Sequence, residues 1–197
     1  MIITIASFKG GVGKTTTAVH LSAYLQKKKP TLLIDGDPNR SASAYTKRGQ
    51  LPFTIVDERG AAKFARNYEH IVIDTEARPD EDDLRSLANG CDLLVIPTTP
   101  DAMAIDALLL TVAALRKVKA ENYKILLTVV PPKPNHDAED ARQMLVGNGL
   151  PVFKSEIRRL IAFQKASLAG VPVYEIKEPR ANVAWESYKS VGREIIK

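Results

Sequence analysis

The chain contains very little cysteine and no long apolar segment. Cys91 is the single cysteine among 197 residues, so no internal disulfide can form, which is consistent with a reducing compartment. No apolar run approaches the roughly 18 residues that a membrane-spanning helix needs. No basic segment precedes the apolar residues that begin the sequence, and a secretory signal peptide is therefore not expected. These absences predict a cytoplasmic protein.

Histidine is also scarce, and its spacing excludes a familiar kind of metal site. His20, His70 and His136 lie far apart in the sequence and lack the spacing of zinc ligands. One cysteine per chain supplies two thiolates to a dimer, whereas an iron–sulfur cluster shared between subunits usually needs four. A nitrogenase-reductase type of protein is therefore excluded by the number of ligands.

Length, composition and charge define the broad class. A chain of 197 residues with 45% hydrophobic content can bury a sizeable core, and a single domain over residues 1–197 is predicted. The formal net charge of +5 is compatible with a nucleic-acid partner, although many basic proteins bind none. The positions of the basic residues are therefore more informative than their number.

A glycine-rich stretch follows the first apolar run, Ile2–Ala6, and precedes a helical pattern. An order of strand, glycine loop and helix is the context that a phosphate-binding loop requires. Glycines allow successive backbone N–H groups to point at an anion, and the start of the helix adds the positive end of its dipole. Lys14 would then reach the β- and γ-phosphates, and the Thr15 hydroxyl would ligate Mg²⁺. The predicted nucleotide-binding residues are Gly10, Gly11, Val12, Gly13, Lys14, Thr15 and Thr16.

This loop departs from the common phosphate-loop pattern because Phe8 stands in place of the first glycine and Lys9 follows it. The run Lys-Gly-Gly-Val-Gly-Lys-Thr resembles the deviant Walker A motif of the ParA/MinD family of dimeric ATPases. The resemblance implies that Lys9 reaches across a dimer interface to the nucleotide of the other subunit. Lys9 and Lys14 are therefore candidate catalytic residues.

Carboxylates follow two further apolar runs. Asp35 and Asp37 come directly after Thr31–Ile34, and Asp74 ends the run that begins at His70. The family resemblance implies that Asp37 positions the attacking water and that Asp35 supports the Mg²⁺ shell. An aspartate that ends an apolar strand downstream of a phosphate loop is typical of Walker B, so Asp74 is a second predicted Mg²⁺ ligand. Asp35 and Asp37 could instead be turn-forming residues.

Apolar runs and helical patterns alternate along the rest of the chain. Further strands are predicted at 51–56, 93–96, 125–130 and 171–174, and Asp57 is expected to cap a helix. Acidic residues at 80–83 are expected to begin another helix, because acids favour its positive terminus. The alternation predicts an α/β fold, a three-layer sandwich with a mainly parallel central sheet. The family resemblance implies that this fold is a P-loop NTPase of the SIMIBI type.

Three later segments suggest binding surfaces. The turn and helix that follow Pro97 resemble the dimer-facing segment of the family, although a buried helix would show the same pattern. The proline-rich loop after residue 130 could border the adenine ring, with Pro132 and Asn135 as its contacts. The segment from Ile157 resembles the part of ParA proteins in which basic residues bind the DNA backbone, here Arg158, Arg159 and Lys165. A solvated basic helix edge remains an alternative.

The resemblance covers nearly the whole chain and implies a Mg²⁺-dependent ATP hydrolase, with ATP and Mg²⁺ as cofactors. It further implies a homodimer in the ATP-bound state, non-specific binding to nucleoid DNA, and cargo positioning with a ParB-like or McdB-like adaptor. The stretch from Asp35 to Ala42 is similar to the carboxysome-positioning branch. The short segment before the loop leaves no room for a DNA-reading winged-helix domain, so sequence-specific autorepression is not expected.

Other functions remain open within the same superfamily. A MinD-like membrane ATPase would need a bulky amphipathic C-terminus, whereas residues 192–197 offer little apolar area, and stable membrane association is not expected. A small-molecule kinase or ligase would need a substrate pocket that the sequence does not identify. A nucleotide-gated scaffold with negligible turnover is disfavoured by the intact Asp37.

Overall fold

The computed structural model describes residues 1–77 and 81–196. Its centre is a six-stranded sheet of order β3-β2-β4-β1-β5-β6, in which every neighbouring pair of strands runs parallel. The strands are β1 (Ile2–Ser7), β2 (Thr31–Gly36), β3 (Thr54–Asp57), β4 (His70–Ala77), β5 (Leu93–Thr98) and β6 (Tyr123–Leu127). The predicted α/β fold with a parallel sheet is confirmed.

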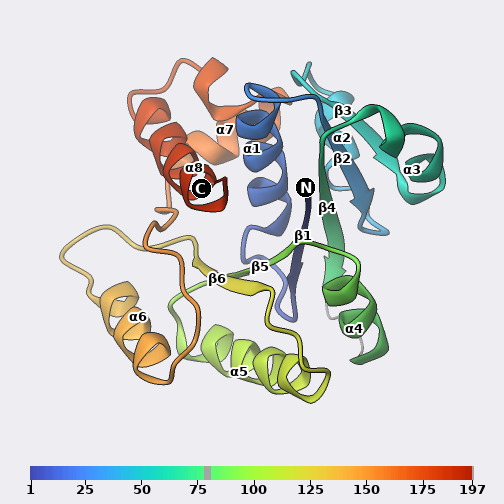
Figure 1. The fold of residues 1–197 in the computed structure, drawn as a ribbon. Helices are drawn as coiled ribbons and strands as arrows, with labels where there is room; N and C mark the ends of the chain where they lie inside the picture. Colours follow the sequence, from blue (N-terminus) through green and yellow to red (C-terminus); the bar gives the residue numbers. More distant parts are fainter. Residues whose placement is uncertain (78–80, 197) are drawn as a thin grey trace.

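Helices cover both faces of this sheet (Figure 1). One face carries α1 (Lys14–Gln26), α7 (Ile161–Ala169) and α8 (Ala181–Ile195), and the other carries α4 (Glu81–Asn89), α5 (Ala102–Lys117) and α6 (Asp137–Gly147). Each face has its own buried apolar cluster against the strands. The short α2 (Ser43–Thr46) and α3 (Glu58–Phe64) lie near β2 and β3, with a 3-10 turn at Ala65–Asn67. The predicted three layers are therefore present.

Parallel pairing brings the motif-bearing strand ends to one edge. Asp35 at the end of β2 is paired in register with Asp74 of β4, and Ile5 of β1 is paired with Asp74 from the other side. β1 leads directly into the glycine-rich loop. The carboxyl ends of parallel strands are where α/β sheets bind ligands, and this edge carries the candidate site.

Three predicted strands differ from the structure, and the one predicted at 51–56 begins only at Thr54, as β3. β6 ends at Leu127 rather than at residue 130, because Val129 adopts a left-handed conformation with φ of 52° and breaks the extended backbone. The strand predicted at 171–174 is wrong, since Val173–Glu175 forms a 3-10 turn. Pro172 has no N–H for a ladder, and the Val173 N–H donates to the His20 ring instead of to a strand.

Helix starts follow the expected chemistry. The Asp57 carboxylate accepts a hydrogen bond from the Gly60 N–H at 2.8 Å, which confirms the predicted cap of α3. The helix expected from the acidic run begins at Glu81, while Asp80 lies outside the described residues. Among the described residues, no helix combines the length and the apolar character needed to cross a bilayer.

Candidate functional site

The glycine-rich loop connects β1 to α1 and has the backbone shape of an anion site. Gly11 and Gly13 have φ values of 77° and 83°, a region that other residues enter only with strain. Gly13 is the N-cap of α1, and no side chain caps this helix. The first N–H groups of α1 are therefore available to a bound anion at the positive end of the helix dipole.

Thr128 fixes this loop to the sheet, a role that the sequence did not reveal. Its buried hydroxyl lies 2.7 Å from the Val12 carbonyl oxygen and 3.1 Å from the Thr98 carbonyl oxygen. The Thr128 N–H also donates to Thr98 at 2.8 Å. One residue after β6 thus joins the middle of the loop to the end of β5, which holds the loop in one position.

Lys14 and Thr15, which the sequence predicts to act at the phosphates and at Mg²⁺, lie at the start of α1. Lys14 is 8% exposed, so most of the residue is removed from solvent. Lys14 and Thr15 both act on the ionisation of Asp74, with Thr15 as the stronger influence of the two. The structure therefore brings together the loop lysine, the loop hydroxyl and the Walker B candidate.

Asp74 offers the arrangement that a magnesium ion would use. Its side chain is fully buried, and neither carboxylate oxygen makes a hydrogen bond within residues 1–77 and 81–196. Burial raises its pKa to about 7, helped by Asp35 and opposed by the Thr15 hydroxyl and the Lys14 ammonium. A buried carboxylate with two unused oxygens beside a threonine hydroxyl fits Mg²⁺, which prefers oxygen ligands and few carboxylates. The described residues contain no cluster of three or more His, Cys, Asp or Glu side chains that could hold a metal alone.

Asp35 is equally buried, but its oxygens are occupied. One oxygen accepts the Ser43 N–H at 2.7 Å and the Ser43 hydroxyl at 2.6 Å. The other accepts the Asp37 N–H at 3.3 Å. Asp35 therefore closes the loop between β2 and α2, and its contribution to a Mg²⁺ shell stays a prediction.

Asp37 lies at the tip of that closed loop. Its Oδ1 accepts the Asn39 N–H at 2.9 Å and the Asn39 side-chain amide at 3.0 Å. Arg40 has φ of 53°, and its guanidinium donates to the Asp35 carbonyl oxygen at 2.5 Å. The backbone N–H of Arg40 donates to the Asp37 carbonyl oxygen at 2.8 Å. Arg40 thus braces the loop that presents Asp37, a contribution that no sequence pattern indicated.

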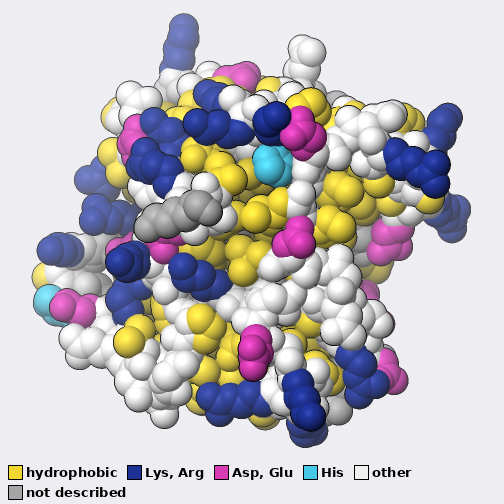
Figure 2. Space-filling model, in the orientation of Figure 1, with side chains coloured by type: hydrophobic (Ala, Val, Ile, Leu, Met, Phe, Trp, Pro, Cys, Tyr) yellow, Lys and Arg dark blue, Asp and Glu magenta, His cyan; other side chains and the backbone are white. Residues whose placement is uncertain are grey.

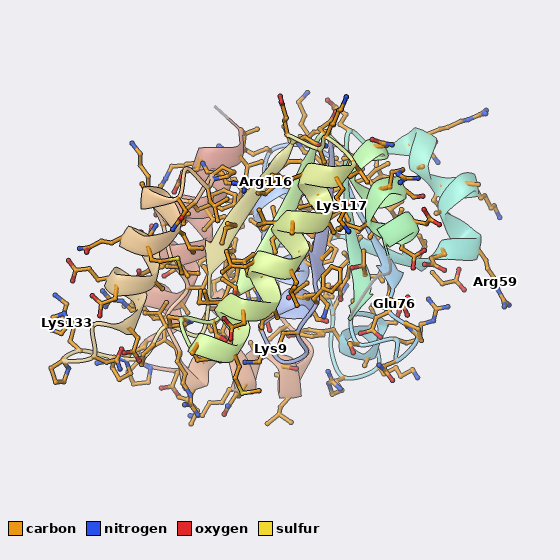
Figure 3. All side chains as sticks on the ribbon, turned by 90° about the horizontal axis from the view of Figure 1, so that it is seen from below. Lys9, Arg59, Glu76, Arg116, Lys117 and Lys133 are labelled. Carbon is orange, nitrogen blue, oxygen red and sulfur yellow. The ribbon has the colours of Figure 1, made fainter. Side chains whose placement is uncertain are left out.

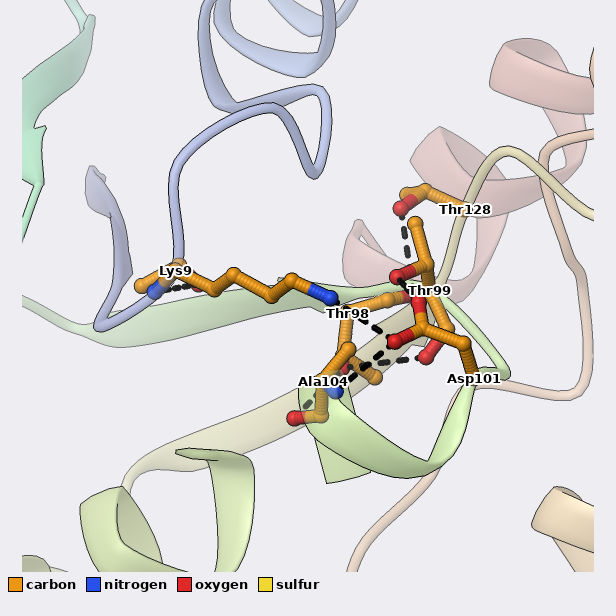
Figure 4. Close-up of polar contacts among 7 residues, drawn as sticks. Lys9, Thr98, Thr99, Asp101, Ala104 and Thr128 are labelled. Atoms are coloured by element: carbon orange, nitrogen blue, oxygen red, sulfur yellow. Dashed lines mark hydrogen bonds and ion pairs between the residues drawn. The ribbon is translucent and has the colours of Figure 1, made fainter. Parts of the chain in front are cut away.

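Lys9 does not extend freely into solvent. Its ammonium lies 2.7 Å from an oxygen of Asp101, the residue that caps α5 (Figure 4). Figure 3 places Lys9 at the N-terminal turn of α5, whereas Arg116 and Lys117 lie at the opposite end of that helix. Partial burial opposes the shift, but hydrogen bonds from Lys9, Thr99 and the Ala104 N–H hold the pKa of Asp101 below its ordinary value.

The predicted adenine and DNA contacts come together in one hollow. A space of about 550 Å³ beyond β6 is lined by Pro132 and Asn135 together with Arg158 and Arg159. Arg158 and Arg159 precede α7 in an extended segment, and Arg158 bridges to Val130 beside β6. Lys165 lies instead on α7 and is ion-paired with Glu178.

Arg158 and Arg159 also line a second hollow, of about 290 Å³, which opens onto the glycine-rich loop at Gly11, Gly13 and Thr16. The two arginines thus separate the candidate phosphate site from the larger hollow. Basic side chains gather on this side of the molecule, over α7, α8 and the loop before α6 (Figure 2, left half of the view).

The C-terminal part of the chain, including α8, packs against α1 around His20. The fully buried His20 contacts the Thr16 carbonyl through Nδ1 at 2.7 Å and accepts the Val173 N–H at Nε2. Burial lowers the pKa of His20 to about 4, although the Thr16 carbonyl opposes the shift, so the ring is neutral near pH 7. Tyr188 of α8 stacks on this ring and hydrogen-bonds Thr17. His20 is therefore structural and has no ligand role here.

Comparisons with known proteins identify the family of this chain. A family model described as the CobQ/CobB/MinD/ParA nucleotide binding domain matches residues 3–173. The maintenance of carboxysome distribution protein A (McdA) of Gloeobacter kilaueensis is 32% identical over 201 residues, covering 98% of this chain and 93% of that protein.

Solved structures show the same fold. An ATP complex of a variant of McdA from Cyanothece has a TM-score of 0.74 at 17% identity, covering 97% of this chain and 96% of that chain. The cell division protein MinD of Aquifex aeolicus has a TM-score of 0.75 at 18% identity, with 99% and 96% covered. Because the family model matches most of its length and a relative above 30% identity aligns over nearly all of it, this chain belongs to the CobQ/CobB/MinD/ParA family of nucleotide-binding domains.

Proposed function

We propose that this chain is a Mg²⁺-dependent ATP hydrolase that forms an ATP-dependent homodimer and, as a dimer, binds DNA without sequence specificity. The ParA and MinD members of its family are ATPases. The observation that carries the proposal is Asp74, a buried carboxylate with two unused oxygens, next to Thr15 and the uncapped start of α1. This combination of an anion site and a cation ligand suits a nucleoside triphosphate with its bound metal ion.

In the proposed reaction the protein positions groups and neutralises charge, because phosphoryl transfer asks little covalent chemistry of it. Backbone N–H groups of the glycine-rich loop and the Lys14 ammonium bind the phosphates. Mg²⁺, held by Thr15 and Asp74 with support from Asp35, would neutralise charge on the β- and γ-phosphates when bound. Asp37 orients the attacking water from the loop that Arg40 braces.

Lys9 supplies charge to the site of the partner chain. A lysine that acts in trans makes each site incomplete in a monomer, much as a GTPase without its arginine finger is slow. ATP then favours association, and hydrolysis favours separation. The position of Lys9 beside the N-terminal turn of α5, close to the candidate phosphate site, supports this role.

DNA binding by the dimer is supported by the larger hollow. Arg158, Arg159, Lys133 and Arg180 line it from three separate segments, and all four are exposed. A dimer presents two such sets, and each additional phosphate contact adds to the salt-dependent free energy of binding. Lys165 contributes only after its ion pair with Glu178 opens, so we expect it to matter less.

The biological role that we propose is cargo positioning over the nucleoid with an adaptor protein that stimulates hydrolysis. The name of the Gloeobacter relative describes carboxysome distribution, which makes a protein compartment the first cargo to test, ahead of a plasmid or a chromosome origin. A ParB-like or McdB-like protein is the expected type of adaptor. The proposed site of action is the cytoplasm, on nucleoid DNA.

A MinD-like action at a membrane has weaker support. Ile195 and Ile196, near the C-terminal end, pack against the buried cluster under α1 and α8. They are therefore not displayed as an apolar anchor, while Lys197 lies outside the described residues. Co-sedimentation with anionic liposomes in the presence of ATP tests this alternative.

The proposal is tested by measuring DNA binding with Mg²⁺-ATP, with Mg²⁺-ADP and without nucleotide, across a series of salt concentrations. We expect binding only with ATP, and a steep loss of affinity as salt rises. Replacing Arg158 and Arg159 by Ala should weaken binding to all sequences alike, whereas Lys165→Ala, as a matched control on α7, should change it little. Equal binding in all three nucleotide states, or ATP turnover that yields a phosphorylated small molecule without DNA binding, would contradict the proposal.

A further inference from the structure

Thr128 has one hydroxyl proton and two carbonyl oxygens within its reach. The hydroxyl lies 2.7 Å from the Val12 carbonyl oxygen and 3.1 Å from that of Thr98 (Figure 4). The Thr98 carbonyl oxygen already accepts the backbone N–H of Thr128 at 2.8 Å, whereas that of Val12 receives no other donor from residues 1–77 and 81–196. Because Val12 is the nearer and the less satisfied acceptor, the hydroxyl proton is directed to Val12.

This hydrogen bond fixes the direction of the next backbone donor. The peptide between Val12 and Gly13 is trans, and in a trans peptide the C=O and the following N–H point to opposite sides of the chain. With the Val12 carbonyl held against Thr128, the Gly13 N–H is therefore turned away from Thr128. No acceptor in the described part of the chain takes this N–H, and Gly13 stands at the uncapped start of α1. The Gly13 N–H is thus available to an anion.

The contact that holds this peptide is buried and belongs to the sheet. Val12 and Thr128 are 1% and 2% exposed, so the hydroxyl is shielded from water. A Cβ added to Gly13 would lie 4.0 Å from the Thr128 Cβ, which places the Thr128 side chain directly behind Gly13. Thr128 follows β6, every residue of which is paired with β5. The sheet is therefore the fixed support, and the glycine-rich loop is the segment that it holds.

We propose that Thr128 is a positioning residue for the phosphates of the nucleotide, because its hydroxyl fixes the Val12–Gly13 peptide with the Gly13 N–H facing the anion site. This inference rests on the proposed binding of a nucleoside triphosphate at the glycine-rich loop. A donor that is oriented before the phosphate arrives needs no further ordering on binding, which increases affinity. Without the hydroxyl, the buried Val12 carbonyl has no partner and the peptide is free to turn.

Three substitutions separate this role from a general effect on stability. Thr128→Val removes the hydroxyl and retains a branched side chain behind Gly13, whereas Thr128→Ser retains the hydroxyl. Thr111→Val is the matched control, because Thr111 is a buried threonine of α5 whose hydroxyl donates to the Ala107 carbonyl oxygen at 2.9 Å. Both valine variants lose one hydroxyl-to-carbonyl hydrogen bond, and all three should retain the far-UV circular dichroism spectrum of the unchanged protein.

The first measurement needs no nucleotide. Nitrogen-15 relaxation gives the order parameter of the Gly13 N–H, which is about 0.85 for a rigid backbone and below about 0.6 for a flexible one. We expect a rigid value in the unchanged protein, in Thr128→Ser and in Thr111→Val, and a flexible value in Thr128→Val. Equal order parameters in all four proteins would overturn the inference, whatever the chain does with ATP.

The second measurement is the dissociation constant for Mg²⁺-ADP, obtained by titration calorimetry. We expect Thr128→Val to raise this constant about 5- to 30-fold, because binding must then order a loop that has lost its hydrogen bond. Thr128→Ser should recover most of the affinity, and Thr111→Val should bind as the unchanged protein does. If the unchanged protein does not bind Mg²⁺-ADP, the proposed function fails, and the relaxation result still decides whether Thr128 orients the loop. If it binds and Thr128→Val binds equally well, the inference is wrong.

Discussion

Asp35 and Asp74 lie toward the carboxyl ends of neighbouring strands, are paired in register and are both fully buried, yet their carboxylates have different surroundings. The oxygens of Asp35 are taken by Ser43 and the Asp37 N–H, which closes the loop after β2. Those of Asp74 make no hydrogen bond in the described part of the chain, and its pKa is raised to about 7. Burial of a carboxylate is favourable only when its oxygens have partners.

This difference indicates that Asp35 has mainly a structural role, whereas Asp74 has oxygens available to a ligand. Both oxygens of Asp35 already accept hydrogen bonds within the folded chain, which offsets the burial of this carboxylate without a bound cation. Burial of the Asp74 carboxylate without hydrogen-bond partners destabilises the folded chain, and a bound cation would offset this destabilisation. The two residues therefore should respond in opposite ways to substitution.

The largest expected effect is on catalysis at Asp74. We expect Asp74→Ala to lower Mg²⁺-dependent ATP hydrolysis by about 100-fold or more, because a positioned charge at the phosphates is lost. Phosphate release at saturating Mg²⁺-ATP measures the loss. Asp74→Asn, which retains the shape, should lose activity similarly while melting at the same or a higher temperature than the unchanged protein. Activity within threefold of normal in both variants would contradict the assignment.

The next effect is on stability at Asp35. We expect Asp35→Ala to lower the free energy of unfolding by about 2 kcal/mol, because the Ser43 and Asp37 donors lose their acceptor inside the protein. Urea unfolding without nucleotide measures this change. An unchanged unfolding midpoint would show that the loop does not depend on Asp35.

The pH dependence of the free energy of unfolding should reveal the raised pKa of Asp74 in the unchanged protein. Its pKa is about 7 in the folded chain against 3.8 as the ordinary value, so between pH 4 and pH 7 the folded state retains a proton that the unfolded state has lost. The contribution of this group to stability is therefore fully present at and below about pH 4 and falls as pH rises to about 7, by up to about 4 kcal/mol at roughly 1.4 kcal/mol per pKa unit. Urea unfolding in EDTA at several pH values measures the slope, which Asp74→Asn should flatten. The same slope in both proteins would assign it elsewhere.

The smallest effect is expected at Arg40, which belongs to the structural side of the comparison. We expect Arg40→Ala to lower kcat roughly three- to tenfold with little change in KM, because Asp37 is less well held while the phosphate site is intact. Arg40→Lys can still donate to the Asp35 carbonyl and should recover part of the rate. A rise in KM with normal kcat would instead place Arg40 in nucleotide binding.

Local sequence patterns predicted the parallel α/β arrangement and the strand ends that carry the glycine loop and the aspartates, while phosphate binding there stays a prediction. The glycine loop, the aspartates after apolar runs and the capping residue Asp57 each depend on neighbours within a few residues, which is why they could be predicted. β6 was predicted too long because a run of Thr and Val favours a strand, whereas Val129 has a left-handed backbone. Val129 directly follows Thr128, whose side chain contacts distant segments.

Contacts between distant residues account for most of what the sequence missed. The pair of Lys9 with Asp101, and the hollow that Arg180 shares with Arg158, join residues that have no spacing in common. The brace from Arg40 is local, but it depends on a positive φ that arginine rarely adopts. Composition and periodicity contain no signal for such contacts.

The central claim is that one nucleotide site is completed by two chains, and mixing two inactive variants tests it most directly. Lys9→Ala lacks the residue that serves the partner, and Lys14→Ala lacks the residue that binds its own nucleotide. In a mixed dimer the nucleotide bound by the Lys9→Ala chain still receives Lys9 from the other chain. An equal mixture should therefore recover up to about a quarter of normal ATP hydrolysis, since half of the dimers are mixed and each has one complete site. A mixture as inactive as either variant alone would contradict the claim.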